Sequence, residues 1–452
     1  MSKLFGTDGI RGVANAFPLT PELAISVGRA VVSIFHAKTK PPKVVIGKDT
    51  RLSGFMLEYA LAAGVCSVGG EAHLAGIMPP PGVAFTTSST DAAAGIVISA
   101  SHNPFYDNGI KLFDGDGHKL SDETQHHLEK TILADQALEN KPLIRETGRV
   151  VQLVDASRAY LEFLEGCAAV PGRFAGMKIV LDCSNGATYE IAPDLFRKLG
   201  AEVTALAVHP DGKNINNGCG SEHPQALIKE VATCRADIGL AFDGDGDRMI
   251  AVDETGQVIT GDRILAICAN DIKKKGRLKK NLAVSTVMSN LGLRIALKNM
   301  GIRHRMTNVG DRYVLEEMRA SGAVIGGEDS GHMIFSDYHT TGDGILTGIK
   351  LIEAMHTDSK PLSELSQIMS VFPQILINIE VSHKPDIQTI PEVVQAIETV
   401  EKKLGEQGRV LVRYSGTQPL CRVMVEGPSE EETRRYCTQL SEVIIKNIGL
   451  EG

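Results

Sequence analysis

One pattern occurs three times along the chain: an apolar strand, a polar turn, an amphipathic helix, and a second strand after a glycine. The copies begin at Lys43 (KVVIGKDTRLSG), Met177 (MKIVLDCSNGA) and Asn281 (NLAVSTVMSN). Each copy predicts a β-α-β unit, because such a crossover joins parallel strands and lays its helix on one face of a sheet. The sequence therefore predicts three similar α/β domains.

A fourth, different domain follows the repeats. After residue 370 the chain shows a strand, a helix, two strands and a last helix from Ser429, which predicts a small α+β domain. The predicted fold class is α/β, with three similar mixed-sheet α/β domains plus this smaller C-terminal α+β domain. A length of 452 residues fits such a count, since one domain takes about 150 residues. We expect the domains to span residues 1–153, 154–256, 257–370 and 371–452.

The composition argues against several classes of protein. Lys and Arg number 47 against 55 Asp and Glu, a net charge of -8, whereas a general nucleic-acid binder carries a basic excess. No apolar run approaches the roughly 18 residues of a membrane span, and the first twelve residues lack the apolar stretch of a signal peptide. We therefore expect a cytoplasmic protein with neither nucleic-acid nor membrane partners. Eight cysteines without a C-x-x-C pair predict reduced, mostly buried thiols.

Each repeat is followed by another glycine-bearing strand that runs into a polar loop. These loops end at Pro104 (SASHNP), Arg248 (FDGDGDR) and His332 (GGEDSGH). Because ligands of open α/β sheets bind just beyond the carboxyl ends of strands, the three equivalent loops are candidate walls of one cleft.

The second loop predicts a magnesium site. Asp243, Asp245 and Asp247 alternate with glycines that let the backbone curl, and three close carboxylates repel one another unless a cation lies between them. The same aspartates fit the first, third and fifth places of an EF-hand, with Glu254 at the twelfth. That alternative fails because Arg248 replaces the required glycine at the sixth place and a strand precedes the loop. An ordinary acidic turn remains an alternative.

The first loop places Ser99, Ser101 and His102 directly after a buried strand. A serine beside a histidine is weak evidence for nucleophilic catalysis, since neighbours in sequence project in different directions and no G-x-S-x-G motif is present. A phosphate on the serine would add about two negative charges and three acceptor oxygens. It would then be a further ligand for a cation held by the three carboxylates.

Two more strings suggest ligand contacts. Arg413 to Pro419 (RYSGTQP), with Arg422 shortly after, combines guanidinium groups, hydroxyls and backbone N–H groups in a turn between strands. Such a set can bind a phosphate, although an ordinary hairpin turn is the alternative. Glu328, Ser330 and His332 offer acceptors and a possible acid or base, which fits a polyhydroxylated ligand.

Taken together, these strings resemble the signatures of the α-D-phosphohexomutase superfamily, in the same order over essentially the whole chain. The matching strings are FGTDGIRG (5–12), ASHNP continuing as FYDNGIK (100–111), DGDGDR (243–248), GGEDSGH (326–332) and RYSGTQP (413–419). FGTDGIRG and FYDNGIK are most similar to the phosphoglucosamine mutase branch rather than to the phosphomannomutase and phosphoglucomutase branch.

The resemblance implies four domains around a central cleft and an assignment of site residues. Ser101 would be phosphorylated in the active enzyme, and one Mg²⁺ would bind the Ser101 phosphate, Asp243, Asp245 and Asp247. Catalytic positions would be Ser101, Arg11, Lys111 and His332, with Lys111 or His332 as general acid and base. Substrate-binding positions would be Arg248, Glu328, Ser330, Arg413, Ser415, Gly416, Thr417 and Arg422.

The implied reaction is the interconversion of glucosamine 6-phosphate and glucosamine 1-phosphate, which feeds UDP-N-acetylglucosamine synthesis. Glucosamine 1,6-bisphosphate would be the intermediate and activator, and a homodimer is possible. Asp329 and Gln418 depart from the pattern, where the superfamily branch more usually has Gln and Glu. An extra carboxylate at Asp329 could alter recognition of the amino group. Alternatives are a phosphoglucomutase or phosphomannomutase, and a non-catalytic sugar-phosphate-binding protein.

Overall fold

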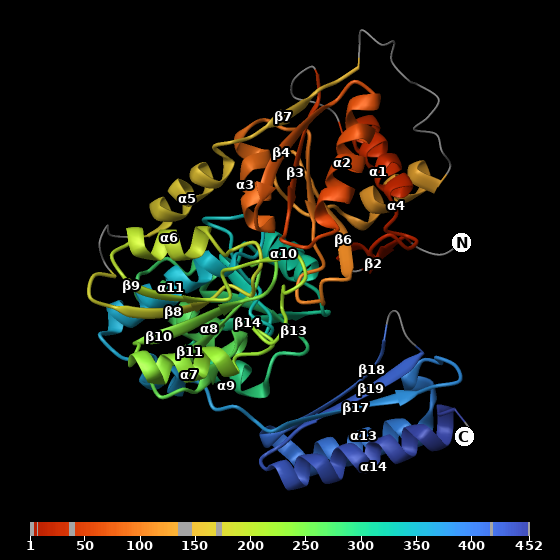
Figure 1. Cartoon of the computed structure of the whole chain (residues 1–452). Helices are drawn as coiled ribbons and strands as arrows, with labels where there is room; N and C mark the ends of the chain where they lie inside the picture. The colour runs from red at the N-terminus through yellow and green to blue at the C-terminus, as the bar shows by residue number, and fades with distance from the viewer. Residues whose placement is uncertain are drawn as a thin grey trace. The chain divides into compact units, whose positions relative to one another are not determined.

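The computed structural model describes residues 4–6, 8–35, 41–133, 147–168, 174–415 and 419–450. The chain forms two compact units, one of residues 1–287 and 303–367 and the other of residues 288–302 and 368–452. The first unit contains the three sheets of the predicted α/β repeats (Figure 1), whereas the helix of the third repeat, α9 (Leu291–Asn299), belongs to the second unit. The predicted α/β fold class is confirmed.

The first sheet has seven strands in the order β1-β2-β6-β5-β3-β4-β7. The first repeat forms β3, α2 and β4, and the glycine-bearing strand β5 pairs in parallel with β3. The strands are β1 (Phe5–Gly6), β2 (Gly9–Val13), β3 (Lys43–Lys48), β4 (Glu71–Ile77), β5 (Ala94–Ile98), β6 (Asp107–Asp114) and β7 (Val150–Gln152). The helices are α1 (Pro21–Ile34), α2 (Gly54–Ser67), α3 (Pro80–Ser89) and α4 (Asp122–Leu133).

Both faces of this sheet are covered, which explains why β3 is an unbroken apolar run. Val44 and Ile46 belong to the core shared with α1 and α2, whereas Val45 belongs to the core shared with α3. Successive side chains of a strand point to opposite faces, so only a sheet buried on both sides takes such a run. Gly28 and Gly64 let α1 and α2 pack closely, since a Cβ on either glycine would lie 2.4 or 2.2 Å from a carbonyl oxygen of the other helix.

The second sheet has five strands in the order β12-β11-β10-β8-β9, and β10 pairs in parallel with β8 but antiparallel with β11. Its elements, with the connecting helix α5, are α5 (Ala156–Cys167), β8 (Lys178–Asp182), α6 (Ile191–Lys198), β9 (Glu202–Leu206), α7 (Gln225–Cys234), β10 (Ile238–Phe242), β11 (Met249–Asp253) and β12 (Val258–Ile259). The antiparallel pair β10 and β11 forms a hairpin, and its turn carries the aspartate motif.

The third sheet has four strands in the order β14-β13-β15-β16 and repeats this plan, with β15 parallel to β13 and antiparallel to β16. Its elements are α8 (Gly261–Lys274), β13 (Leu282–Thr286), β14 (Arg303–Thr307), α10 (Asp311–Ser321), β15 (Ile325–Gly327), β16 (Met333–Phe335), α11 (Gly344–Asp358) and α12 (Leu362–Leu365). The turn between β15 and β16 carries GGEDSGH.

The second unit is the predicted α+β domain together with α9 (Leu291–Asn299). An antiparallel sheet in the order β17-β19-β18 packs against α13 and α14 around a core that includes Val423 and Leu440. Glu426 holds α9 to this sheet by accepting from the Leu291 N–H at 3.0 Å. The elements are β17 (Gln374–Glu380), α13 (Pro391–Leu404), β18 (Arg409–Tyr414), β19 (Leu420–Glu426) and α14 (Glu430–Ile448).

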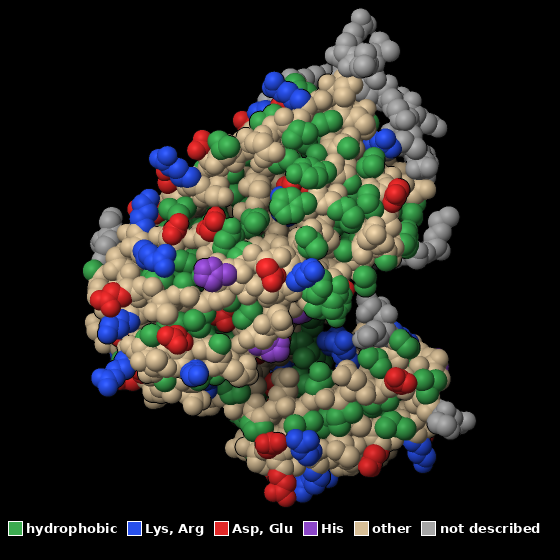
Figure 2. All heavy atoms as spheres, in the orientation of Figure 1, with side chains coloured by type: hydrophobic (Ala, Val, Ile, Leu, Met, Phe, Trp, Pro, Cys, Tyr) green, Lys and Arg blue, Asp and Glu red, His purple; other side chains and the backbone are tan. Residues whose placement is uncertain are grey.

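The chemistry of the surface and of the thiols is that of an ordinary globular protein. On the face drawn in Figure 2, Lys and Arg side chains are interspersed with Asp and Glu. All eight cysteines are free thiols and six of them are buried, as the sequence predicted. None of the helices in the described ranges has both the length and the apolar character that crossing a membrane requires.

Candidate active site

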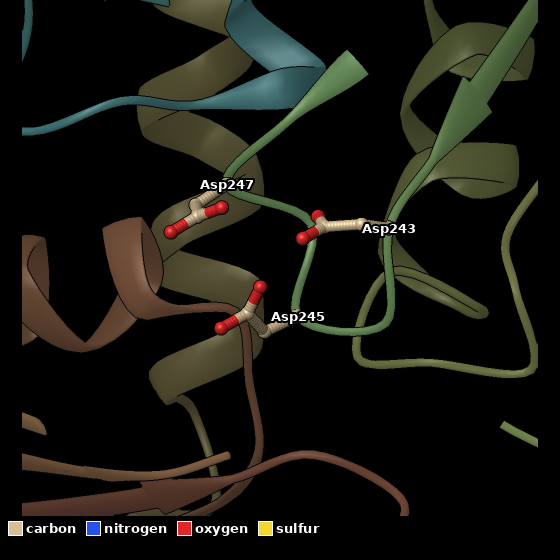
Figure 3. A group of neighbouring side chains, drawn as sticks. All are labelled: Asp243, Asp245 and Asp247. Carbon is tan, nitrogen blue, oxygen red and sulfur yellow. The ribbon is translucent and has the colours of Figure 1, made fainter. Parts of the chain in front are cut away.

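The aspartate motif forms a buried three-carboxylate turn. Asp243, Asp245 and Asp247 point toward one another from the turn between β10 and β11 (Figure 3), and one carboxylate oxygen from each lies within 4.8 Å of the others. All three are at most 4% exposed. Burial, and then the neighbouring charges of Asp245 and Asp247, raise the pKa of Asp243 well above its usual value.

This turn fits a hard divalent cation. Within the described residues, Asp245 Oδ1 and Asp247 Oδ1 are buried without a hydrogen-bond partner, which is costly for a carboxylate oxygen. Mg²⁺ takes oxygen ligands and is commonly bound through carboxylates together with substrate phosphates. The orphaned oxygens therefore fit the predicted magnesium ligands.

Ser101 is next to these carboxylates. The loop after β5 turns at this residue with a left-handed φ of 54°, and the Ser101 hydroxyl donates to Asp243 Oδ2 at 2.5 Å. Non-glycine residues held at positive φ cost free energy and are often found at active sites. The His102 ring is a more distant partner, with Nδ1 3.4 Å from Ser101 Oγ. The structure thus pairs the serine with the cation site rather than with a histidine base.

The other serine of the loop has a structural role. The Ser99 hydroxyl donates to Asp49 Oδ2 at 2.6 Å and accepts from the Ser101 backbone N–H at 3.0 Å. Ser99 is fully buried. Its hydroxyl is therefore committed to holding the loop, whereas that of Ser101 faces the carboxylates.

Arg51 fixes the serine loop, and the sequence did not single it out. Its guanidinium donates to the carbonyls of Ser101 and Asn103 at 2.9 and 2.8 Å, and to Asp49 Oδ2 at 2.8 Å. Both Arg51 and Asp49 are buried. A planar fork of five N–H donors suits several carbonyls at once. The only signal in the sequence was its place in the polar turn that follows the first strand of the repeat.

Lys111 and Arg11 come from the neighbouring strands β6 and β2. Lys111 Nζ lies 2.8 Å from Asp245 Oδ2, 3.5 Å from Asp247 Oδ2 and 3.0 Å from Asp8 Oδ2. Burial opposes the charge of Lys111, but these three carboxylates raise its pKa well above the usual value. Arg11 Nη2 contacts Asp8 Oδ2 at 2.6 Å. The sequence did not identify Asp8, whose carboxylate contacts both Arg11 and Lys111.

Arg248 comes from the turn between β10 and β11, and His332 comes from the turn between β15 and β16. Their backbones form an antiparallel bridge. His332 Nδ1 lies 3.7 Å from Asp247 Oδ1, and His332 Nε2 lies 3.3 Å from Asp311 Oδ2. Burial lowers the pKa of His332, but Asp311 and Asp247 together raise it above the usual value. Asp311 is a second carboxylate that sequence reasoning missed.

The remaining residues of GGEDSGH divide by role. Glu328 Oε1 accepts from the Gly310 N–H at 3.1 Å, and Ser330 is exposed. Asp329, which departs from the superfamily pattern, accepts from the Asp262 N–H at the start of α8, at 3.2 Å. A carboxylate at a helix N-terminus satisfies free N–H groups and the helix dipole. The Asp329 carboxylate therefore has a partner within its own domain.

In the second unit, Arg413 and Arg422 are directly opposite each other on β18 and β19. Directly opposite residues of an antiparallel pair share a face, and like charges there are destabilising unless an anion lies between them. Burial and Arg422 lower the pKa of Arg413. Ser415 is 4% exposed and its carbonyl accepts from Lys384 Nζ at 2.6 Å. Gly416, Thr417 and Gln418 lie outside the described residues.

The fold and this site define an α/β enzyme with a buried serine beside a carboxylate cation site. Four domain models described as phosphoglucomutase/phosphomannomutase match the chain: alpha/beta/alpha domain I at residues 2–139, domain II at 158–256, domain III at 260–372 and the C-terminal domain at 376–443. A curated protein of Syntrophus aciditrophicus, named phosphoglucosamine mutase, is 57% identical over 99% of this chain and 100% of its own length. The chain belongs to the phosphoglucomutase/phosphomannomutase family, so the predicted resemblance is confirmed.

Solved structures agree with this assignment. A phosphoglucomutase/phosphomannomutase family protein of Burkholderia thailandensis is 26% identical and superposes with a TM-score of 0.81 over 99% of both chains. The Aspergillus fumigatus N-acetylphosphoglucosamine mutase, solved in complex with GlcNAc-6P and magnesium, is 16% identical. It covers 98% of this chain and 95% of its own, with a TM-score of 0.69, and at that identity it shows the shared fold alone.

Proposed function

We propose that this chain is a phosphoglucosamine mutase that interconverts glucosamine 6-phosphate and glucosamine 1-phosphate through a phosphoserine and glucosamine 1,6-bisphosphate. The observation that carries the proposal is the 2.5 Å contact between Ser101 Oγ and Asp243 Oδ2, inside a buried three-carboxylate turn. A serine at that place can carry a phosphate whose charge a bound cation neutralises. The Syntrophus relative of that name supports the choice of sugar.

Ser101, Asp243, Asp245 and Asp247 would hold one Mg²⁺ per chain. When bound, the ion neutralises charge that develops on the transferring phosphoryl group. The buried carboxylate oxygens of Asp245 and Asp247 that lack a hydrogen-bond partner support this choice of metal.

In the forward direction, the bond between phosphorus and Ser101 Oγ breaks as a bond forms to the free hydroxyl oxygen of the sugar phosphate. The sugar hydroxyl proton passes to a basic group, for which Lys111 and His332 are the two candidates, and the same group returns a proton in the reverse step. His332 is the better of the two, because the three carboxylates around Lys111 keep that ammonium group protonated and unable to accept a proton. Arg11 and Lys111 place positive charge beside this transfer, while Arg248, Glu328 and Ser330 orient the sugar. After the bisphosphate has turned round, its other phosphate returns to Ser101.

The phosphate that does not react would bind the cradle formed by Arg413, Ser415, Gly416, Thr417 and Arg422. Two guanidinium groups opposite each other support this assignment, because an anion relieves their repulsion. One cradle then serves both orientations of the bisphosphate.

Replacing Arg413 with alanine should weaken substrate binding and increase release of the bisphosphate into solution. A lost charge-assisted hydrogen bond of about 1.5–3 kcal/mol corresponds to a rise in KM of about 10- to 150-fold. Ser101 should still be phosphorylated by a saturating concentration of added bisphosphate, because the residues around the transferring phosphate are unchanged and only the hold on the other phosphate is weakened. Steady-state kinetics and chromatography of released bisphosphate measure both effects. Unchanged KM together with unchanged release would refute the cradle.

Turnover on three sugar phosphates tests the function itself. With Mg²⁺ and a bisphosphate activator, we expect kcat/KM to be highest for glucosamine 6-phosphate and lower for glucose and mannose 6-phosphates. A preference for glucose or mannose 6-phosphate would make the chain a phosphoglucomutase or phosphomannomutase. Tight binding without any turnover would make it a sugar-phosphate-binding protein.

We also propose a cytoplasmic location and a homodimer. Eight free thiols support a reducing compartment. Leu52, Phe55 and Tyr59 are 58%, 50% and 62% exposed around the start of α2, and such apolar side chains are typical of an interface. Light scattering of the purified chain measures its mass and tests this state.

The proposed domain limits remain residues 1–153, 154–256, 257–370 and 371–452. Strand β12 (Val258–Ile259) lies just beyond the proposed boundary at residue 256, but it belongs to the sheet of the second domain. Limited proteolysis, which cuts at exposed segments between domains, tests the four proposed limits.

A further inference from the structure

Lys119 lies in the hairpin turn that follows β6, the strand that carries Lys111. Its backbone forms an antiparallel bridge with Phe113, while Asp114 N–H donates to the His118 carbonyl at 2.9 Å and closes the turn. The Lys119 side chain is 11% exposed. A long, charged side chain is buried here only if its ammonium group has partners.

Those partners are two carboxylates that sequence reasoning missed. Lys119 Nζ donates to Asp8 Oδ1 at 2.8 Å and to Asp311 Oδ2. Asp8 comes from the turn between β1 and β2, and Asp311 is the first residue of α10. One ammonium group therefore ties the first sheet to the third, within a single compact unit.

Each of these carboxylates also contacts a proposed catalytic residue. Asp8 Oδ2 lies 3.0 Å from Lys111 Nζ, and Asp311 Oδ2 lies 3.3 Å from His332 Nε2. The hydrogen bonds and ion pairs of Lys119 reach Lys111 and His332 through one carboxylate each, although its charge also repels both of these cations directly. Residues that reach the catalytic groups through one intermediate side chain set the orientation of those groups.

The charges explain why a lysine is needed between them. Without a cation the Asp8 and Asp311 carboxylates would repel each other across a buried space. Burial disfavours the Lys119 charge, but Asp311 and then Asp8 raise its pKa above the usual value. The cation therefore remains in place and keeps both carboxylates at fixed positions.

We propose that Lys119 is a positioning residue that orients Lys111 and His332 together, through Asp8 and Asp311. This inference rests on the proposed mutase function and deepens it. A shift of about 1 Å in a reacting group can reduce a rate about 100-fold. Loss of Lys119 should therefore slow the chemical step while leaving the contacts to substrate phosphate intact.

A second ion pair offers a matched control. Arg312 Nη1 and Nη2 donate to Asp122 Oδ1 and Oδ2 at 2.5 and 2.8 Å, and this pair joins the same two domains. Arg312 directly follows Asp311, yet the recorded contacts of the pair include none of the proposed catalytic residues. If Lys119 serves only to tie the two domains together, the Asp122→Asn variant should have the same defect as Lys119→Met.

The experiment measures kcat and KM for Lys119→Met, Lys119→Arg and Asp122→Asn in the full chain with Mg²⁺. Each kcat is divided by the fraction of folded protein, measured as the amplitude of the thermal unfolding transition, so misfolded protein does not count. For Lys119→Met we expect kcat to fall about 10- to 100-fold with KM changed less than about threefold. Lys119→Arg, which retains the positive charge, should recover part of that loss, and Asp122→Asn should keep a kcat within about twofold of the parent.

Two results would overturn the inference while the parent chain stays an active mutase. The first is a corrected kcat for Lys119→Met equal to that of the parent, and the second is an equal loss in Asp122→Asn. If Lys119→Met does not fold, Lys119→Gln takes its place, because its amide can still donate a hydrogen bond but carries no charge. A corrected kcat about 10-fold or more below that of the parent, with Lys119→Arg closer to the parent, supports the positioning role, and any smaller loss in Lys119→Gln refutes it. An inactive parent chain would instead refute the proposed function.

Discussion

Replacing Ser101 with alanine should reduce mutase turnover by at least about 10⁴-fold, because the chain would lose the oxygen that carries the phosphoryl group. The fold should survive. Ser101 has a φ of 54°, which alanine tolerates about as well as serine, and the hydroxyl makes one strong hydrogen bond, to Asp243. Circular dichroism should therefore show no change in secondary structure.

Ser99→Ala is the matched control for this variant. Ser99 is buried two residues away, and its hydroxyl bonds to Asp49 and to the Ser101 N–H. Its loss should loosen the loop and cost about 1–2 kcal/mol of stability, but the phosphate carrier remains. Intact-mass analysis after incubation with a sugar bisphosphate should show one added phosphate on the parent and on Ser99→Ala, and none on Ser101→Ala. Phosphate retained by Ser101→Ala would contradict the assignment.

The architecture was readable from the sequence because it depends on local patterns. Apolar runs such as Val44 to Ile46 are typical of strands buried on both faces, and three copies of one pattern indicate three sheets. The further glycine-bearing strand of each repeat was also predicted, and the structure shows that it pairs in parallel with the first strand of its repeat: β5 with β3, β10 with β8 and β15 with β13. The motifs at the ends of these strands were therefore expected close together.

The supporting residues of the site were not readable in this way. Arg51, Lys119 and Asp311 have no sequence pattern of their own, since each has at least one partner 50 or more residues away. An arginine in a polar turn is usually exposed, and nothing local predicts that Arg51 is fully buried against four loop carbonyls. Such residues become visible only when the fold brings their partners together.

At Asp329 the structure adds a contact that the local pattern does not show. The sequence suggests that this extra carboxylate beside Glu328 could alter recognition of an amino group, and its Oδ1 accepts from the Asp262 N–H at the start of α8. The sequence contains both residues, 67 positions apart, without showing that they meet. Glu328 is engaged in the same way, because its Oε1 accepts from the Gly310 N–H at 3.1 Å, so the amino group of a sugar would compete with a backbone N–H at either carboxylate.

The three-carboxylate turn leads to a prediction in which stability and activity change in opposite directions. Asp243→Asn should make the metal-free protein more stable, raising its thermal midpoint by about 2–5 °C, because it removes one of three mutually repelling buried charges. The asparagine can keep every recorded hydrogen bond of Asp243. Its Oδ1 accepts from the N–H groups of Gly246 and Arg248, and its amide nitrogen donates to Ser101 Oγ in place of the donation that Asp243 Oδ2 receives.

The same substitution should remove the response to magnesium. A parent chain at 100 times its dissociation constant for Mg²⁺ gains about 2.7 kcal/mol, whereas the variant should gain far less and lose about 10²- to 10³-fold in turnover. Thermal unfolding with and without Mg²⁺, together with turnover, measures these effects.

Asp182→Asn is the matched control for this prediction. Asp182 is equally buried, and both of its carboxylate oxygens accept backbone N–H bonds, from Ser184 and Gly220. An asparagine there turns an amide group toward one of these donors, so the metal-free protein should lose stability while its Mg²⁺ response persists. If the thermal midpoint of the metal-free protein rises in Asp243→Asn and falls in Asp182→Asn, the effect at Asp243 is relief of charge repulsion and not the general cost of burying an aspartate. If Asp243→Asn instead destabilised the metal-free protein and kept its Mg²⁺ response, the three carboxylates would not form the cation site.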